Sequence, residues 1–423
     1  MKRRSFPFAE FLTIDAGTKR IKLIYDIHGL AFLIPLFRLH KRETGTSINA
    51  QGFIEGFDMA NKKLKSLEKE MLVCTQCGYC RSVCPIFEDL GWDSSVARGK
   101  VILAYGMLKD RFDIDDSVIE TLYQCSTCGD CERRCPSNVD VVDIIEAARK
   151  ELFEKYPLEK HKKFAENIMK YGNPYGETEK RGEKFGKTPK KAKVGFFIGC
   201  TPAYRNQNIA KTTMSILDKL KVDYTVIDEV CCGSPLQRVG GNDEDIKKLV
   251  DHNLNSVEEL GIETLLFSCA GCYNMFKNHY PEFRELKFKP LHITEFLAEQ
   301  DLPLKALPIT ITYHDPCHLG RHAKVYDAPR KIIEKIPKAK FKEMELNREM
   351  ARCCGGGGGL RAAFPDISKR MAGRRVEDAK FADLILTSCP FCVNNLIFGK
   401  ELTDNDIEIK DIVELVDELL ETP

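Results

Sequence analysis

Eighteen cysteines constrain this chain more than any other feature, because they form two spacing patterns that each occur twice and leave none over. The first pattern is Cys-x-x-Cys-x-x-Cys-x-x-x-Cys-Pro, which begins at Cys74 and again at Cys125. The second is a lone cysteine, a Cys-Cys-Gly and a Cys-x-x-Cys, which begins at Cys200 and again at Cys317. No apolar signal-peptide core follows Met1 to Arg4, so we expect metal binding or redox chemistry rather than disulfides.

The first pattern is typical of [4Fe–4S] sites. Three cysteines at i, i+3 and i+6 surround part of a cubane, and in two-cluster ferredoxins the cysteine before proline ligates the other cluster. Gly78 and Gly129 beside the ligands would let backbone N–H groups approach cluster sulfur. Zinc knuckles and thioredoxin-type pairs are the weaker alternatives. The expected ligand sets are Cys74, Cys77, Cys80 and Cys135 for one cubane, and Cys125, Cys128, Cys131 and Cys84 for the other.

Residues 194–423 have the pattern of an internal duplication. The lone cysteines are 117 residues apart, the double cysteines 122 and the closing pairs 120, and such near-constant offsets indicate two copies of one unit. Short apolar runs at 194–198, 264–267, 309–313 and 384–386 precede cysteines, and their length predicts buried parallel strands. Each copy is therefore predicted to be an α/β unit with its cysteines in loops just past the strand ends.

Composition and punctuation complete the predicted organisation. A hydrophobic share of 43% and a charged share of 30% predict a soluble, folded protein, and a net charge of +1 gives no indication of nucleic acid binding. No run approaches the ~18 apolar residues of a transmembrane helix. The nearest, Leu30 to Phe37, is broken by Pro35 and is expected to pack locally or dock onto a partner.

The predicted fold class is α/β and α, with a helical domain for two [4Fe–4S] clusters followed by two tandem Rossmann-like α/β units. The boundaries follow from charge-rich and Gly/Pro-rich stretches. We expect a leader and possible partner-docking segment at 1–65, a helical ferredoxin domain at 66–155, a solvated linker at 156–193, and α/β units at 194–305 and 306–423.

Each copy of the second pattern offers five cysteines, one more than a cubane needs. Adjacent cysteines do not easily serve one tetrahedral metal, but they can serve different irons of a larger cluster. A cubane or zinc remains an alternative at this point. The two sets are Cys200, Cys231, Cys232, Cys269 and Cys272, and Cys317, Cys353, Cys354, Cys389 and Cys392.

With its motifs, the chain resembles the D subunit of heterodisulfide reductases over residues 66–420, and its first part resembles the helical ferredoxin domain of succinate dehydrogenase iron–sulfur subunits. Both five-cysteine sets are complete, which favours catalysis over electron relay alone. The stretches that carry the resemblance are His292–Ala298, Tyr313–His322, Asp327–Arg330, Arg352–Gly355 and Cys389–Cys392.

The resemblance implies that each five-cysteine set binds a noncubane [4Fe–4S] cluster and that the disulfide of coenzyme M and coenzyme B is cleaved between them. His318 is our candidate proton donor or substrate contact, whereas His314 and His322 are expected to hydrogen-bond cluster sulfur or cap a helix. The glycine run 355–359 lacks a Walker A ending, so we expect close backbone approach or a flexible loop. Candidate contacts to an anionic substrate, or ordinary surface or cluster-neutralising arginines, are Arg205, Arg238, Arg321 and Arg352.

The resemblance also implies partners and a location. A membrane cytochrome b or another redox subunit would supply electrons, the assembly would be a hetero-oligomer, and the chain would be cytoplasmic, peripheral on the inner face of the membrane. Two alternatives share the layout: an electron-transfer subunit of a flavin-dependent lactate, glycolate or glycerol-phosphate dehydrogenase, and a subunit of a sulfite-reduction membrane complex. No nucleotide-binding Gly-x-Gly-x-x-Gly is visible in a strand–helix context.

Overall fold

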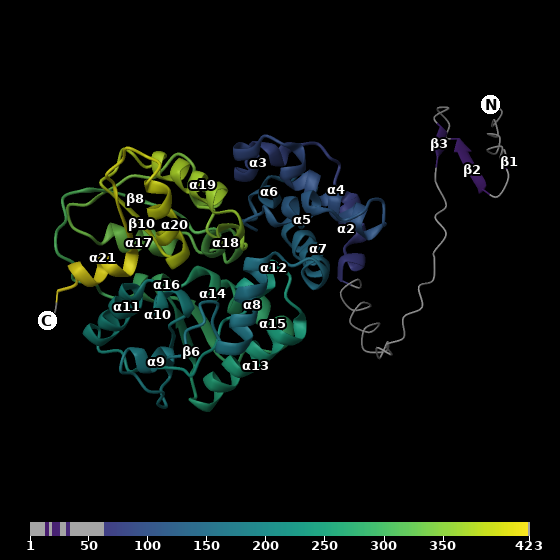
Figure 1. The fold of residues 1–423 in the computed structure, drawn as a ribbon. Helices are drawn as coiled ribbons and strands as arrows, with labels where there is room; N and C mark the ends of the chain where they lie inside the picture. The colour runs from purple at the N-terminus through teal and green to yellow at the C-terminus, as the bar shows by residue number, and fades with distance from the viewer. Residues whose placement is uncertain (1–12, 17–18, 26–30, 34–62, 422–423) are drawn as a thin grey trace, which may run out of the picture. The chain divides into compact units, whose positions relative to one another are not determined.

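The computed structural model describes residues 13–16, 19–25, 31–33 and 63–421, in two units, Met1–Ile54 and Glu55–Pro423. In the first unit, β1 (Thr13–Ala16), β2 (Lys19–Tyr25) and β3 (Ala31–Leu33) pair antiparallel in that order. The apolar stretch predicted for docking continues past β3, so most of it lies outside the described residues. All eighteen cysteines belong to the second unit, drawn from blue to yellow in Figure 1.

The second unit begins with a helical part that carries the first cysteine pattern. Its core forms where α4, α5 and α7 pack through apolar side chains such as Val101, Leu122 and Ile144, all buried. Asp115 caps α5 by accepting a hydrogen bond from the Val118 N–H, which satisfies one free donor of the first turn. The elements are α2 (Glu68–Val73), η1 (Tyr79–Ser82), α3 (Pro85–Leu90), η2 (Asp93–Ser95), α4 (Ala97–Leu108), α5 (Asp116–Tyr123), α6 (Asp130–Arg134) and α7 (Val141–Lys155).

Two four-stranded parallel sheets follow, with the same strand order. The first runs β5-β4-β6-β7 and the second β9-β8-β10-β11. The four predicted apolar runs are the strands β4, β6, β8 and β10, which confirms them. The edge strands β5, β7, β9 and β11 were not predicted. Strands β7, β9 and β11 are only partly buried and carry no apolar run, whereas β5 is buried but only three residues long. The strands are β4 (Val194–Phe197), β5 (Tyr224–Val226), β6 (Thr264–Phe267), β7 (Lys289–His292), β8 (Thr310–Tyr313), β9 (Lys340–Phe341), β10 (Leu384–Thr387) and β11 (Glu408–Asp411).

Helices connect and cover the strands of each sheet. The last helix of each copy starts with the same device, a capping box formed by His292 with Glu295 and by Asp411 with Glu414. The helices of the first copy are α10 (Cys200–Tyr204), α11 (Gln207–Lys219), α12 (Ser234–Val239), α13 (Asp243–Glu259), α14 (Ala270–Asn274), η3 (Met275–His279), α15 (Tyr280–Phe283) and α16 (Ile293–Ala298). Those of the second copy are η4 (His318–His322), α17 (Asp327–Glu334), η5 (Arg348–Met350), α18 (Leu360–Ala363), α19 (Pro365–Glu377), α20 (Pro390–Lys400) and α21 (Ile412–Leu419).

The two copies pack against each other through matching elements. The helix α21 of the second copy lies on α11 of the first (Figure 1), and α16 of the first lies on α17 of the second. Lys219 reaches across the first contact to Asp417, and Lys335 reaches across the second to the carbonyl oxygens of Ala298 and Gln300. The duplicated sequence therefore forms a pseudo-symmetric pair of α/β units.

The segment 156–193 differs from the predicted solvated linker. It contains α8 (Glu159–Tyr171), whose residues His161, Ala165 and Ile168 are buried, and α9 (Arg181–Lys184), where Arg181 is buried. The charged residues that suggested a linker lie on the outer side of α8, while an apolar stripe at helical spacing faces the core. This segment forms part of the site described below.

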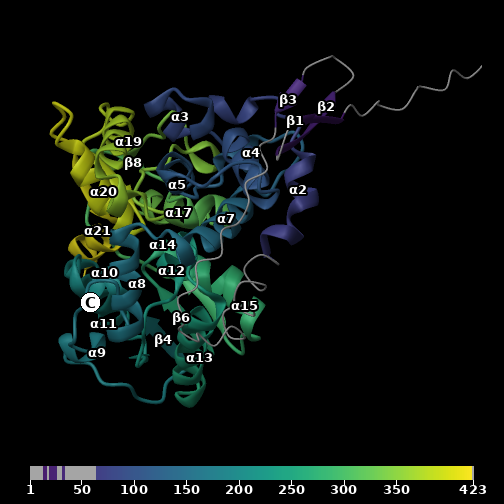
Figure 2. The ribbon, with the colours of Figure 1, turned by 45° about the vertical axis from the view of Figure 1, so that its right-hand side comes forward.

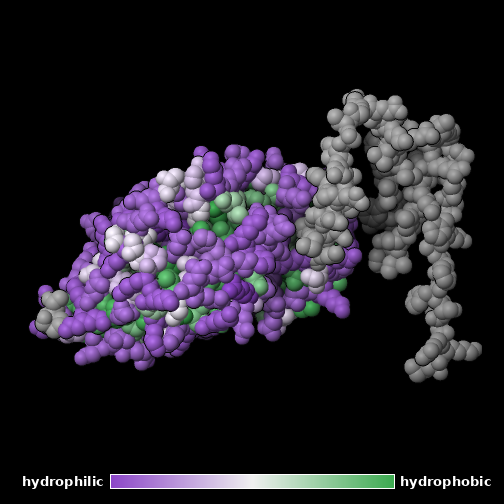
Figure 3. Space-filling model, turned by 90° about the horizontal axis from the view of Figure 1, so that it is seen from below, coloured by the Kyte–Doolittle hydropathy of each residue, from purple (hydrophilic) through white to green (hydrophobic). Residues whose placement is uncertain are grey.

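The described helices do not have the length and apolar character that a bilayer requires. None of them is both long enough and apolar enough to cross a membrane. The face drawn in Figure 3 is mostly hydrophilic, with hydrophobic residues confined to small separate places.

Candidate functional site

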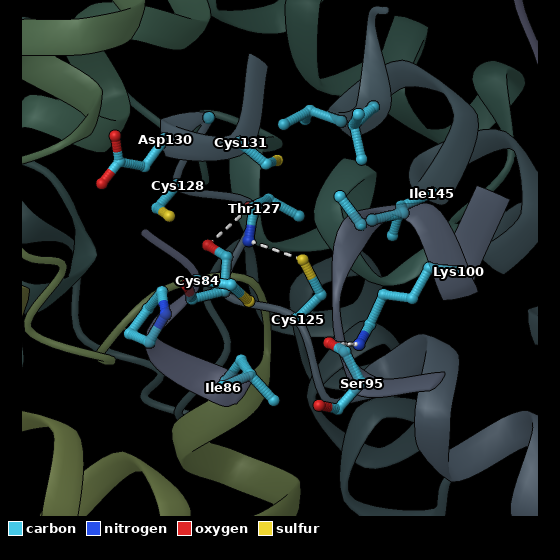
Figure 4. A pocket seen from close by; sticks show the side chains of 16 residues that line it. Cys84, Ile86, Ser95, Lys100, Cys125, Thr127, Cys128, Asp130, Cys131 and Ile145 are labelled. Atoms are coloured by element: carbon cyan, nitrogen blue, oxygen red, sulfur yellow. Dashed lines mark hydrogen bonds between the residues drawn. The ribbon is translucent and has the colours of Figure 1, made fainter. Parts of the chain in front are cut away.

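Four cysteines of the first pattern line one cavity in the helical part (Figure 4). They come from both copies of the pattern, with Cys84 joining Cys125, Cys128 and Cys131. The Thr127 N–H donates to the sulfur of Cys125 over 3.4 Å, so backbone donors already point at this cavity. All eighteen cysteines of the chain are free thiols, and this donor set has the chemistry that an iron–sulfur cluster needs.

The two copies of the first pattern share a left-handed backbone at matching positions. Gln76 and Thr127, each just before the second cysteine, have φ values of 55° and 51°, while Gly78 and Gly129 have 82° and 73°. Successive residues of this kind turn their N–H groups toward a common concavity that favours anions. The glycines were expected beside the ligands, but the strained φ of Gln76 and Thr127 leaves no signal in the sequence.

A buried lysine faces the same cavity and was not identified from the sequence. Lys100 on α4 is 1% exposed, and its ammonium group donates to the carbonyl oxygen of Ser95. Burial lowers the pKa of Lys100, while the nearby thiols of Cys125 and Cys84 oppose that shift. The lysine therefore places a cationic group beside this cysteine set (Figure 4).

The other four cysteines of the first pattern lie nearer the surface. Cys77 is exposed, whereas Cys74, Cys80 and Cys135 are partly buried and pack on the core of the helical part. Hydrogen bonding from the backbone of Tyr79 lowers the pKa of Cys77.

Both copies of the second pattern open onto one large cavity of about 850 Å³. Nine of their ten cysteines line it, all except Cys353. Cys200, Cys269, Cys317 and Cys389 follow the ends of β4, β6, β8 and β10, as predicted, whereas the two Cys-Cys pairs lie in the segments that follow β5 and β9. Parallel strands of one sheet end at the same edge, which brings these segments together. Cys269 of the first set and Cys389 of the second both line it, so the two sets meet in this cavity.

The first set is held by a buried ion pair. Arg181 donates to the sulfur of Cys200 over 3.0 Å and lies 3.4 Å from Glu229, and both charged side chains are nearly inaccessible. Burial raises the pKa of Glu229 to about 7, against the opposing effect of Arg181. Arg181 lies in the segment that was expected to be a linker, so sequence reasoning missed it.

The second set has histidines instead. The Nδ1 atom of His318 lies 3.3 Å from the sulfur of Cys317, and this ring also lines the large cavity. Burial, followed by the positive charge of Arg238, holds the pKa of His318 well below its usual value. His314 lies beside Cys354 and Cys392, away from the cavity, and His322 instead bonds the carbonyl oxygen of Thr127.

The helical part touches the second set directly. The side chains of Cys128 and Cys353 pack in one buried cluster, and the interaction with Cys353, followed by burial, raises the pKa of Cys128. Arg321 fixes this contact, because its guanidinium donates to the carbonyl oxygen of Cys128 over 2.7 Å and to that of Ala351 over 2.5 Å. Arg321 is therefore an interdomain clamp, and the sequence-based idea of a substrate contact was wrong for this residue.

The glycine run 355–359 belongs to the same contact. A Cβ on Gly358 would lie 2.6 Å from the carbonyl oxygen of Cys125, so only glycine allows the two backbones to meet there. Arg149 on α7 joins three parts of the fold by donating to the carbonyl oxygens of Cys125, Arg238 and Gly358. The run was expected to approach a cluster or substrate, whereas the close approach in the structure is to the backbone of the helical part.

The charged side chains that line the large cavity are all basic among the described residues. Arg238 is buried and pairs with Glu146, and Arg205 stacks on Tyr175 with 4.2 Å from the guanidinium carbon to the ring centre. Two of the four predicted arginines are therefore at the cavity, while Arg352 pairs with Glu88 outside it. The complete basic lining is Lys160, Lys163, Arg205, Arg238 and Arg361.

Comparison with known proteins identifies the family. Residues 70–139 match the model of the 4Fe-4S dicluster domain, and residues 194–277 and 311–397 match that of the Cysteine-rich domain. The D subunit of the dihydromethanophenazine:CoB–CoM heterodisulfide reductase of Methanosarcina barkeri is 36% identical over 387 residues, 83% of this chain and 94% of that protein. The chain belongs to the family of heterodisulfide reductase D subunits. The predicted family and the iron–sulfur character of both cysteine patterns are thereby confirmed.

Relatives of this heterodisulfide reductase family member carry other names as well. The B subunit of the fumarate reductase (CoM/CoB) of Methanothermobacter marburgensis is 33% identical over 366 residues, 82% of this chain and 72% of that protein. The probable iron-sulfur-binding oxidoreductase FadF of Bacillus subtilis is 31% identical over 327 residues, 70% of this chain and 46% of that protein. Oxidoreductases with different names thus share this layout.

Proposed function

We propose that this chain is the disulfide-cleaving iron–sulfur subunit of a heterodisulfide reductase and that its substrate is the CoB–CoM heterodisulfide. The observation that carries the proposal is the large cavity, which both complete five-cysteine sets share and whose charged lining side chains are all basic among the described residues. Lys160 and Lys163 of this lining lie on α8, which carries no cysteine, so an electron relay does not require them. The substrate of the proposed reaction is a disulfide with anionic ends, which such a lining would attract.

The cofactors proposed are two cubane clusters on the first-pattern cysteines and two noncubane clusters on the second. When bound, they would supply single electrons and iron atoms that can accept the two thiolates of a cleaved disulfide. The residues fit, because every cysteine is a free thiol, four first-pattern cysteines line one cavity, and nine second-pattern cysteines line the other. For each cluster we propose the ligand set that the cysteine spacing predicts.

The protein residues would bind and orient the substrate. Arg238 and Arg361 lie on elements of different copies, α12 and α18, and Lys160 and Lys163 lie on α8. Cations on different elements suit an elongated substrate with more than one anionic group. His318, which lines the cavity beside Cys317, stays our candidate for holding a proton for a product thiolate.

Electron delivery would use the helical part. Cys77 is the exposed cysteine, so a partner is expected to dock near it, and the contact of Cys128 with Cys353 connects the helical part to the second set. By the family's naming, we propose a hetero-oligomer with a cytochrome b or another redox protein. That partner would hold the chain on the inner face of the membrane.

The test is anaerobic oxidation of reduced benzyl viologen by the iron-loaded chain, with the CoB–CoM heterodisulfide as acceptor. We expect turnover that is lost in Cys353→Ser. Arg361→Met should lower kcat/KM for the heterodisulfide by about 10–100-fold, since a hydrogen bond to a charged group contributes about 1.5–3 kcal/mol. Arg348→Met, an exposed arginine outside the cavity, is the matched control and should change nothing.

The acceptor itself provides a second control. An uncharged disulfide of similar length should react with wild type and Arg361→Met equally, because no anionic group meets the arginine. An absence of turnover from a preparation with full iron content would reject the proposal. That result would favour a relay beside a flavin dehydrogenase or a place in a sulfite-reduction complex.

A further inference from the structure

A buried histidine beside the second cysteine set has no role in the proposed cavity. His314 follows β8, is fully buried, and lies three residues before Cys317. One of its ring nitrogens and the sulfurs of Cys354 and Cys392 all lie within 4.8 Å of one another. At the matching place in the first copy, three residues before Cys200, stands Phe197, which has no hydrogen-bond donor on its side chain.

A second buried residue fixes the orientation of this ring. Arg375 on α19 is fully buried, and its Nε–H donates to Nδ1 of His314 over 3.1 Å. Because a guanidinium donates and never accepts, Nδ1 must be the acceptor and the ring proton must sit on Nε2. Arg375 is itself held 3.3 Å from Asp378, one turn further along α19.

The remaining ring N–H has no partner other than the cysteine set. Among the described residues, no nitrogen or oxygen accepts a hydrogen bond from Nε2. The backbone of His314 is fixed as well, since its N–H donates to Leu386 and its carbonyl oxygen accepts from Thr387.

We propose that His314 donates its Nε2–H to sulfur of the iron–sulfur group bound by the second set and thereby raises the reduction potential of that group alone. This inference rests on the proposed function, because it assumes a cluster on these cysteines. A donor to thiolate or sulfide sulfur stabilises the more negative, reduced state. The dependent step is a one-electron transfer in which the helical part is oxidised and the second set reduced, and the proton stays on His314.

The consequence is a functional difference between two similar cysteine sets. The second set is the one in contact with the helical part through Cys128 and Cys353. A higher reduction potential at the second set would favour electron transfer from the helical part to this set. Arg375 acts through His314 and is a positioning residue.

The experiment is a redox titration of the iron-loaded protein followed by EPR, with the second-set signal identified as the one that Cys353→Ser removes. His314→Phe, which installs the residue of the first copy, should shift the one-electron equilibrium about tenfold toward the oxidised state, or about 59 mV downward. His314→Gln keeps an N–H donor and should recover most of this shift. Phe197→Leu in the first copy should leave the second-set potential unchanged.

An unchanged potential in His314→Phe at full iron content would overturn the inference, and so would an equal shift of every EPR signal, which would indicate a general structural effect. Wild-type protein provides a test that needs no change at His314. With ¹⁵N-labelled histidine, pulsed EPR should detect a weak nitrogen coupling on the second-set signal that persists in His318→Phe; no coupling would also overturn it. A chain that shows the potential shift but no heterodisulfide turnover would reject only the proposed function.

Discussion

The two Cys-Cys-Gly sets have five cysteines each in the same order, but different charged and hydrogen-bonding residues surround them. The first set adjoins a buried ion pair, in which Arg181 bonds Cys200 and faces Glu229. The second set adjoins His314, the cavity residue His318 and a cysteine of the helical part, Cys128. Duplication therefore preserved the metal-binding chemistry, while the segments that each copy happens to pack against made the two sets different.

The largest expected effect is on the first set. Arg181→Met should destabilise the protein by about 3–5 kcal/mol, because it leaves Glu229 buried without its partner. The measurement is urea unfolding of the iron-loaded protein, together with EPR of both sets, and the second-set signal should stay. Arg181→Met combined with Glu229→Gln removes the isolated charge and should recover part of the loss. A loss below about 1 kcal/mol in the single variant would mean that the pair does not support the first set.

The next effect concerns the glycine run that distinguishes the second copy. Gly358→Ala should cost about 1–3 kcal/mol more than Gly261→Ala, because both have positive φ but only Gly358 would press a Cβ against backbone atoms of Cys125 and Ser126. Urea unfolding compares the two variants. We expect a magnetic coupling between the second-set group and the helical part in the EPR spectrum, and this coupling should be lost only in Gly358→Ala. Equal losses of stability would show that this close approach has little importance.

Acid should destabilise the fold at the same contact, because protonation would place a charge on the buried Nδ1 of His161, which has no hydrogen-bond partner among the described residues. His161 donates to the carbonyl oxygen of Gly359 over 2.9 Å, and burial lowers its pKa to about 4. Because the folded pKa lies below the unfolded value of about 6.5, this histidine contributes stability above pH 6.5 that is lost as the pH falls toward 4. From pH 7.5 to 5 the loss should be about 2 kcal/mol.

The measurement is the free energy of unfolding of wild type and His161→Phe at both pH values. The variant should lack this part of the acid sensitivity, whatever its stability at pH 7.5. An identical pH dependence in both proteins would mean that His161 accepts a proton without destabilising the fold.

The smallest effect should fall on the surface that the copies share. Asp417→Ala removes the partner of Ser215 and Lys219 across the contact between α11 and the C-terminal helix α21, both labelled in Figure 2. This pair is partly exposed, so the cost should be about 0.2–1 kcal/mol. Glu418→Ala, whose partner Lys410 belongs to the same copy, is the control and should leave both EPR signals unchanged, as Asp417→Ala should. A selective loss of one set's EPR signal in Asp417→Ala would contradict the view that the two sets differ through their own neighbours, because this contact supports both copies.

The sequence predicted strands wherever burial left a continuous apolar run, and failed where it did not. The central runs such as Phe196–Phe197 and Leu265–Phe267 are fully buried and read clearly, whereas the edge strand Lys340–Phe341 has no pattern of its own. The segment 156–193 was taken for a linker because of the Gly- and Pro-rich stretch 171–176 and the Lys/Glu/Gly-rich run up to Lys193. The helix α8 lies within this segment. Its inner face carries His161 against Gly359, a contact between residues 198 positions apart that no local pattern can indicate.

The sequence by itself determined the family, the duplication and the cysteines that carry the chemistry, because metal ligation requires fixed residue types at short spacings. Only the tertiary structure decided what surrounds them. It brought Lys100 to one cysteine cavity, Arg181 to Cys200 and Arg375 to His314, and it turned Arg321 from a candidate substrate contact into a clamp on Cys128. The potential and charge at each set depend on such long-range neighbours, which packing selects and spacing does not record.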